Sequence, residues 1–214
     1  MAKLSKGILG PISGALGPIV GATWKGVPYV RLRPVKKPKS KQKRTAAQRA
    51  NQSRFAFIQK WFVPFYSFIT VGFRNHASDR TEINAAFSAN YKTAFSGEYS
   101  DIVVDYSKIL LSKGNLPGLH LPGLSWMGTD TIELTWLKNP NIDVAFDDQI
   151  MLVLYCPELH KVDGFIGGVK RNAMYCSFKF NEYMIGKALE VYVSVTSFDR
   201  RRISESMYLG RMEV

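Results

Sequence analysis

The stretch ALEVYVSVTSF (residues 188–198) alternates aliphatic and more polar side chains with a period of two. TIELTWL (residues 131–137) repeats the pattern, with Ile132, Leu134 and Trp136 separated by Thr and Glu. A period of two is typical of a β-strand with one face in a core and one face in water. These two stretches predict antiparallel strands and direct the search for the remaining ones.

Further strands are predicted on both sides of these two stretches, and no helical pattern separates them. Strands joined by loops alone favour an antiparallel β-sandwich, which we expect over residues 99–214. IMLVLYC is apolar on both faces, so it is the predicted central strand. The additional segments are 102–111 (IVVDYSKILL), 150–156 (IMLVLYC), 173–180 (AMYCSFKF) and a part of 203–214.

Residues 45–98 show helical periodicity and form a predicted two-helix segment. Thr45 and Gln48 have the spacing of a capping box, and apolar residues follow at three- and four-residue steps. Pro64 is expected to kink this first helix. A second helix is expected to start near Asp79, with Glu82 three residues later. The fold class expected for the whole chain is therefore α+β.

Charge divides the 214-residue chain into two unlike parts. Residues 1–78 carry 15 Lys and Arg and no Asp or Glu, whereas residues 79–214 carry 14 basic and 17 acidic residues, a net charge of −3. Hydrophobic residues make up 46% of the chain, which excludes wholesale disorder. Two cysteines are too few for a disulfide scaffold.

The N-terminal residues 1–44 are predicted to be an extended Gly/Pro-rich and basic arm. Residues 7–27 contain the near-repeat GILGPIS, GALGPIV and GATWKGV. Glycine and proline oppose a helix. Because the arm is apolar, it needs a surface to pack against, either on another subunit or on its own body. GVPYVRLR (26–33) alternates like a strand. Because it contains Pro28, an edge strand is predicted. The expected association residues are Gly7, Gly10, Gly14, Gly17, Gly21, Trp24 as anchor, Lys25, Gly26 and Tyr29.

Residues 31–44 hold eight basic residues in fourteen, with two prolines and no acid. Such a run is typical of a charged contact segment, which meets either nucleic acid or the acidic face of a neighbour. No aromatic residue interleaves the run, so stacking on bases is poorly supported. The predicted contact residues are Arg31, Arg33, Lys36, Lys37, Lys39, Lys41, Lys43 and Arg44.

The first residues imitate a signal peptide, because two lysines precede eighteen uncharged residues. Five glycines and two prolines make this stretch a poor apolar helix, and no clean cleavage site ends it. The same prolines oppose a membrane-spanning helix. We therefore expect neither a cleaved signal nor a membrane span, and a cytoplasmic location is favoured.

Motifs for catalysis or cofactor binding are absent from the sequence. It contains no nucleophile elbow, zinc-protease motif, phosphate loop or dinucleotide fingerprint. Cys156 and His160 are a weak candidate metal pair. Asp143, Asp147 and Asp148 are a weak cation candidate that more simply forms an exposed acidic turn. We therefore expect no enzyme activity, no cofactor and no metal.

Taken together, several short motifs give the chain a specific resemblance. They are Trp24-Lys25-Gly26 with Tyr29 and Arg31, Asn51-Gln52 with Phe55, residues 104–114 with Leu116-Pro117, Phe146-Asp147-Asp148, and Ser204-x-Ser206-x-Tyr208-Leu209-Gly210. With these motifs the chain resembles, over essentially its whole length, an uncharacterised bacterial family of unknown function of about 200 residues. The resemblance implies no mechanism.

These observations favour a non-enzymatic structural protein that self-associates through its N-terminal arm into an oligomer or filament. Thirty-three extended residues reach on the order of 100 Å, enough to cross a neighbouring subunit. The opposed charges of arm and body suit head-to-tail contact. The alternative is a non-specific nucleic-acid-binding protein that uses the basic segment 31–60. An enzyme or a small-ligand carrier is the third class.

Overall fold

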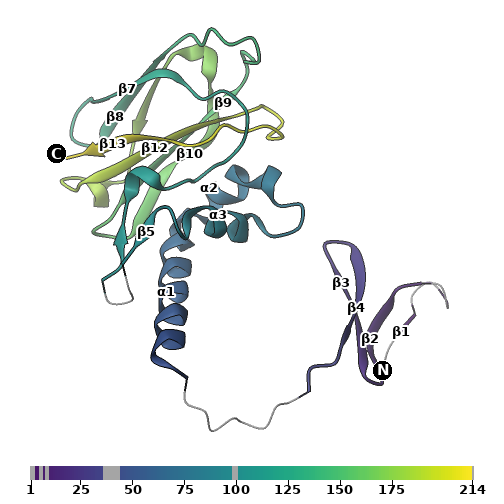
Figure 1. Cartoon of the computed structure of the whole chain (residues 1–214). Helices are drawn as coiled ribbons and strands as arrows, with labels where there is room; N and C mark the ends of the chain where they lie inside the picture. The colour runs from purple at the N-terminus through teal and green to yellow at the C-terminus, as the bar shows by residue number, and fades with distance from the viewer. Residues whose placement is uncertain (1–2, 5–6, 8–9, 36–43, 98–100, 214) are drawn as a thin grey trace. The chain divides into compact units, whose positions relative to one another are not determined.

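The computed structural model describes residues 3–4, 7, 10–35, 44–97 and 101–213. The chain divides into two compact units, Met1–Thr45 and Ala46–Val214. Both helices and antiparallel sheets are present, so the α+β class is confirmed (Figure 1). The second unit is called the body below, and the first unit, which carries the predicted association residues, is taken up with the functional site.

The largest sheet of the body has four antiparallel strands in the order β10-β9-β12-β13. The prediction of a central strand at 150–156 is confirmed, because β9 pairs with β10 on one side and β12 on the other. The prediction at 188–198 is confirmed by β12, which also pairs with β13. The bounds are β9 Gln149–Cys156, β10 Lys161–Lys170, β12 Leu189–Thr196 and β13 Met207–Met212.

A second sheet has three antiparallel strands in the order β11-β8-β7. The predicted strand 131–137 is confirmed in full, since β8 covers the same residues. A short antiparallel pair, β5 with β6, lies outside both sheets. The bounds are β5 Phe95–Ser96, β6 Val103–Val104, β7 His120–Trp126, β8 Thr131–Leu137 and β11 Tyr175–Lys179.

The helical part of the body begins at the predicted place and breaks at Pro64. A 3-10 turn that contains Pro64 separates the first two helices, because proline cannot donate the next helical hydrogen bond. The third helix begins after Thr81, whose hydroxyl accepts from the Asn84 amide; the expected start near Asp79 is therefore wrong. The bounds are α1 Ala46–Phe62, α2 Tyr66–Gly72 and α3 Glu82–Asn90.

One apolar core lies between the two sheets. Alternate residues of β9 and β12 point into it from the four-stranded sheet, and Ile132, Leu134 and Trp136 of β8 point into it from the other side. The expected core role of Trp136 is confirmed, and its indole also donates to the carbonyl of Arg171 at 2.7 Å. The periodicity of β8 thus identified its buried face correctly.

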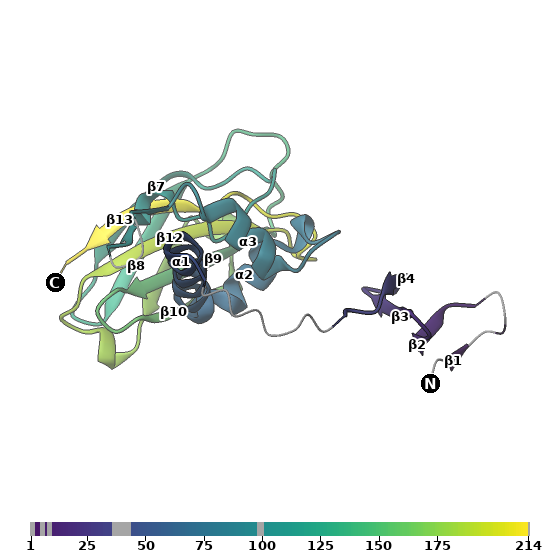
Figure 2. The ribbon, with the colours of Figure 1, turned by 60° about the horizontal axis from the view of Figure 1, so that its bottom comes forward.

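A second core lies between the opposite face of the four-stranded sheet and the helices (Figures 1 and 2). Aromatic rings of the helices meet Tyr155 of β9 there, with Trp61 at 5.4 Å and Phe65 at 4.9 Å between ring centroids. The helical layer also corrects one expectation about β12. The face of β12 that carries Glu190 is buried under this layer, although its polar residues suggested a face in water.

Two strands of the larger sheets of the body, β7 and β10, escaped the sequence pattern, and one predicted strand is wrong. Prolines and glycines interrupt β7 and β10, so their alternation is weak. The predicted strand 102–111 contains only the two residues of β6. Asp105 ends it, because its carboxylate accepts from both the amide and the hydroxyl of Ser107 and so stabilises a turn.

Candidate functional site

The N-terminal unit is a four-stranded antiparallel sheet in the sequential order β1-β2-β3-β4. The sequence predicted an extended or turn-rich arm in preference to a helix, and the structure shows the turn-rich form: the chain folds back on itself instead of running as a single extended segment. The prediction of an edge strand at 26–33 is confirmed, since β4 ends the sheet. The bounds are β1 Lys3–Leu4, β2 Ile12–Leu16, β3 Ile19–Trp24 and β4 Val27–Leu32.

Two tight turns within the glycine-rich stretch join the strands of this sheet. Gly17-Pro18 joins β2 to β3, and Lys25-Gly26 joins β3 to β4. Lys25 and Gly26 have φ angles of 49° and 81°, the positive values that a two-residue hairpin turn requires at both central positions. Glycine and proline therefore exclude a helix here by forming hairpins.

Gly21 is required by the pairing of β2 with β3. It lies opposite Gly14 in the register, and a Cβ added at Gly21 would collide with the carbonyl oxygen of Ile12. The structure shows which backbone approaches Gly21: it is the neighbouring strand of the same unit.

Both faces of this sheet carry apolar side chains. The cross-strand pairs Trp24–Val27 and Ala22–Tyr29 define one face, here called the Trp24 face. The pairs Gly21–Val30 and Ile19–Leu32 define the opposite face, called the Leu32 face. A sheet that is apolar on both faces is normally covered on both faces.

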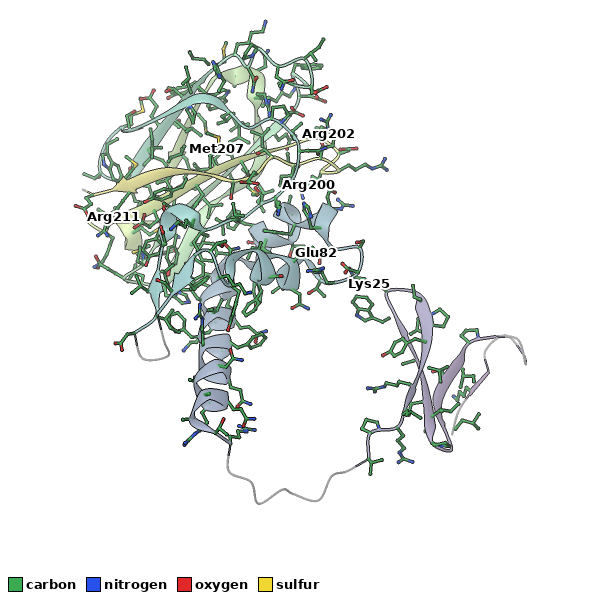
Figure 3. The ribbon with its side chains drawn as sticks, viewed as in Figure 1. Lys25, Glu82, Arg200, Arg202, Met207 and Arg211 are labelled. Carbon is green, nitrogen blue, oxygen red and sulfur yellow. The ribbon has the colours of Figure 1, made fainter. Side chains whose placement is uncertain are left out.

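Neither face is covered within the described residues of the unit. Gly21 is the only buried residue among those described before residue 46. Trp24 is 45% exposed and Leu32 is 76% exposed. Lys25 stands at the tip of the β3–β4 hairpin, where its ammonium lies 5.5 Å from the Trp24 ring centroid (Figure 3). The unit thus pairs its backbone internally but leaves its large side chains in water.

The other predicted association residues are distributed along the same sheet. Gly7 and Gly10 form a turn in which the Gly10 amide donates to the Gly7 carbonyl at 3.0 Å. Tyr29 projects from β4 and is exposed. The structure therefore gathers the predicted set into one sheet, with Trp24 and Tyr29 on one face and the glycines at turns and close approaches.

The basic contact segment is described only at its two ends. Arg31, Arg33 and Arg44 are exposed. Arg54 on α1, which the sequence places within the basic stretch 31–60, points into the body, where it donates to the carbonyls of Phe95, Tyr91 and Gly97. Arg54 therefore serves the fold. The remaining predicted contacts, Lys36, Lys37, Lys39, Lys41 and Lys43, lie outside the described residues.

The weak metal pair Cys156 and His160 is not brought together as a site. Cys156 is fully buried in the core between the sheets. His160 belongs to the other side, where its Nδ1 lies 3.0 Å from the Tyr155 hydroxyl and its Nε2 lies 3.3 Å from the Lys60 carbonyl. Among the described residues, no three His, Cys, Asp or Glu side chains could hold a metal ion together.

The expected exposed acidic turn before β9 is wrong for one of its members. Asp143 is exposed, but Asp148 is only 1% exposed and faces Arg171, with 3.5 Å between Oδ2 and Nε. Burial raises the pKa of the Asp148 carboxyl more than Arg171 lowers it. Sequence reasoning missed Arg171, because an arginine in KRNAM reads as an ordinary basic turn.

No helix in the described part of the chain has the length and apolar character that a membrane crossing requires. A search of curated proteins finds no match to the chain. A family model does match, over residues 11–210, and its range takes in the hairpins of the N-terminal unit together with the whole core of the body. The chain therefore belongs to DUF6266, a family of unknown function.

Proposed function

We propose that this protein is a non-enzymatic structural protein that self-associates through its N-terminal sheet into an oligomer or filament. The observation that carries the proposal is the sheet β1–β4, which has apolar side chains on both faces. Of the residues described before residue 46, only Gly21 is buried. A contiguous exposed apolar surface of this kind is typical of an interaction site. Partner subunits would supply the missing layers.

The energetics favour association through the faces of the sheet. Burial of one large apolar side chain contributes about 1.5–3 kcal/mol, so several side chains of a face have to be buried together to exceed the cost of association. Trp24 is the proposed anchor, because large aromatic residues dominate interface energies. The free edge of β4 is a weaker candidate for strand addition, since Pro28 has no amide to donate.

For the body, we propose a β-sandwich with two N-terminal helical elements on one face. The support is the apolar core shared by the sheets β10-β9-β12-β13 and β11-β8-β7, together with the aromatic core under α1 and α2. In this arrangement the body is complete in itself and the N-terminal sheet is the part that needs a partner. We retain a cytoplasmic location as part of the proposal.

The proposal is tested by the mass of the protein in solution. Light scattering on the full chain, at low and high salt, should show an assembly that persists at high salt because its contacts are apolar. A variant lacking residues 1–35 should keep the helix and strand content of the body and run as a monomer. A full chain that stays monomeric at high concentration would contradict the proposal.

Substitution of the anchor gives a finer test. Trp24→Ala should weaken assembly by about 2 kcal/mol or more per contact. Phe198→Ala is the matched control, because Phe198 is also a large exposed ring, but it belongs to the body. An equal loss of assembly in both variants would show that the Trp24 face has no special role.

A second candidate function is non-specific binding of nucleic acid. The observation that favours it is the exposure of Arg31, Arg33, Arg44 and Arg49, which extends the basic run at both ends. Retention on DNA should fall steeply with salt. A variant with glutamine at Lys36, Lys37, Lys39, Lys41 and Lys43 should then show weaker retention and a flatter salt slope. No retention of the native protein at low salt would exclude this function.

A further inference from the structure

A cavity of about 490 Å³ opens on the body between the loop 138–146 and the turn 171–174. Its walls combine apolar side chains, Val144, Phe146 and Met174, with two cations, Lys138 and Arg171. Among the described residues that line it, none is acidic. The size is that of a small-molecule site, and the composition favours an anionic ligand that also has an apolar part.

Arg171 lines this cavity although it is only 5% exposed. Several contacts hold it in place. Its amide donates to the Asp148 carbonyl at 2.6 Å, and its own carbonyl accepts from the Trp136 indole. Nη2 of the guanidinium donates to the Pro117 carbonyl. Main-chain and side-chain contacts together leave the guanidinium little freedom to turn outward.

The guanidinium nevertheless keeps unused donors. Nε and Nη1 are buried and have no hydrogen-bond partner among the described residues. A buried donor without an acceptor is destabilising by about 1–3 kcal/mol, so such a group calls for an explanation. Nε and Nη1 lie on different edges of the planar guanidinium, so each can offer one charge-assisted hydrogen bond to an anion such as a carboxylate.

Asp148 compensates this cation only in part. Its Oδ2 lies 3.5 Å from Nε, too far for a good hydrogen bond, and the same oxygen accepts from the Ala145 amide at 3.1 Å. Burial lowers the pKa of Arg171 more than Asp148 raises it, because the carboxylate offsets only part of the cost of burying the cation. The described residues that line the cavity supply no further negative charge.

We propose that this cavity binds a small organic acid, with its carboxylate at Arg171 and its apolar body against Val144, Phe146 and Met174. Lys138 at the loop adds attraction for the anion. The carboxylate belongs either to a free small acid or to the C-terminus of a short peptide. The site lies wholly within the body and is independent of the proposed self-association.

Titration of the full chain, followed by calorimetry, tests the charge requirement with two matched pairs of probes. Benzoate should bind with a dissociation constant of about 1 mM or tighter, and benzamide at least about tenfold more weakly. Acetyl-Gly-Phe with a free carboxylate should likewise bind more tightly than the same peptide with a C-terminal amide. The tighter of the two acids identifies the source of the carboxylate. Equal affinity for acid and amide in both pairs, or no binding of any probe, overturns the proposal.

Two variants place the ligand in the cavity. Ala145→Trp should fill the space and weaken benzoate binding at least about tenfold, while Arg171 and Asp148 stay paired. Its control is Ala47→Trp, an exposed alanine of α1 that does not line the cavity. Arg171→Lys keeps the charge but removes the planar guanidinium, and should lose a similar factor in affinity; because it also removes the buried contact to Pro117, its melting temperature is measured beside the affinity. Unchanged affinity in Ala145→Trp would place benzoate elsewhere and overturn the proposal.

Discussion

Strands β9 and β4 both carry apolar side chains on both faces, yet they lie in opposite environments. Seven of the eight residues of β9 are buried, between the helices on one side and the second sheet on the other. All six residues of β4 are exposed. The body thus covers its central strand with layers of its own chain, whereas the described N-terminal unit has one layer only. The same sequence signature can therefore indicate a core or a contact surface.

Truncation of a leucine in each strand should give the largest difference between the two regions. Leu154→Ala in β9 empties a fully buried position and should lower the free energy of unfolding of the body by about 2–5 kcal/mol. Leu32→Ala in β4 should change it by about 0.5 kcal/mol or less, because the side chain is exposed. Urea denaturation of dilute protein measures both. Similar losses in the two variants would break the comparison.

A glycine substitution should disrupt the N-terminal sheet without touching the body. Gly21→Val brings side-chain atoms onto the Ile12 carbonyl and should destabilise the β2–β3 pairing by about 1–3 kcal/mol. Ala22→Val, one position along the same strand, is the control, because valine suits a strand. Hydrogen exchange of the β2 and β3 amides should rise in Gly21→Val alone. Protected amides in that variant would show that the close approach is not essential.

The two regions should also differ, by a smaller amount, in how their stability depends on pH in the acid range. The native pKa of Asp148 lies above the ordinary 3.8, because burial outweighs the attraction of Arg171. Just above pH 3.8 the native state therefore holds a proton that the unfolded state has lost, so this contribution to stability falls as the pH rises through that window. Asp148→Asn should remove this contribution alone, so the difference in stability between the native protein and the variant should shrink as the pH rises, as measured by urea denaturation at several pH values.

The N-terminal unit should be insensitive in the same window. Residues 1–45 contain no Asp, Glu or His, so no side chain of the unit titrates between about pH 4 and 7. Assembly measured by light scattering should change only as far as the acidic groups of the body take part in the contact. An assembly that dissociates in this range would assign its contacts to the body.

Alternation over several residues was the most dependable sequence signal. It located β8 and β12, and it identified the inward residues Ile132, Leu134 and Trp136 of β8 correctly. A continuous apolar run located β9. It failed for β7 and β10, where prolines and glycines interrupt the pattern. Within 102–111 it suggested a strand where Asp105 stabilises a turn. A short side-chain contact can thus override a weak periodic preference.

The proposed sites differed in how far the sequence could identify them. The repeat and the exposed aromatics pointed to residues 7–29 as an association segment, although the hairpins that present them were not foreseen. Nothing in the sequence distinguished Arg171 from any surface arginine. Its importance arises from Asp148 and Trp136, which lie more than 20 residues away in the chain and come into contact with it only in the folded body.

The sequence by itself determined the α+β class, the confirmed strands of the body, the helix break at Pro64 and the charge division between the two regions. These features are local, because they depend on side-chain periodicity and backbone geometry within a few residues. Only the tertiary structure decided which polar faces are buried. Glu190 lies on a face that alternation assigns to water, and it is buried because helices distant in the sequence cover that face of the sheet. Burial depends on which distant segments pack together, and no local pattern records that.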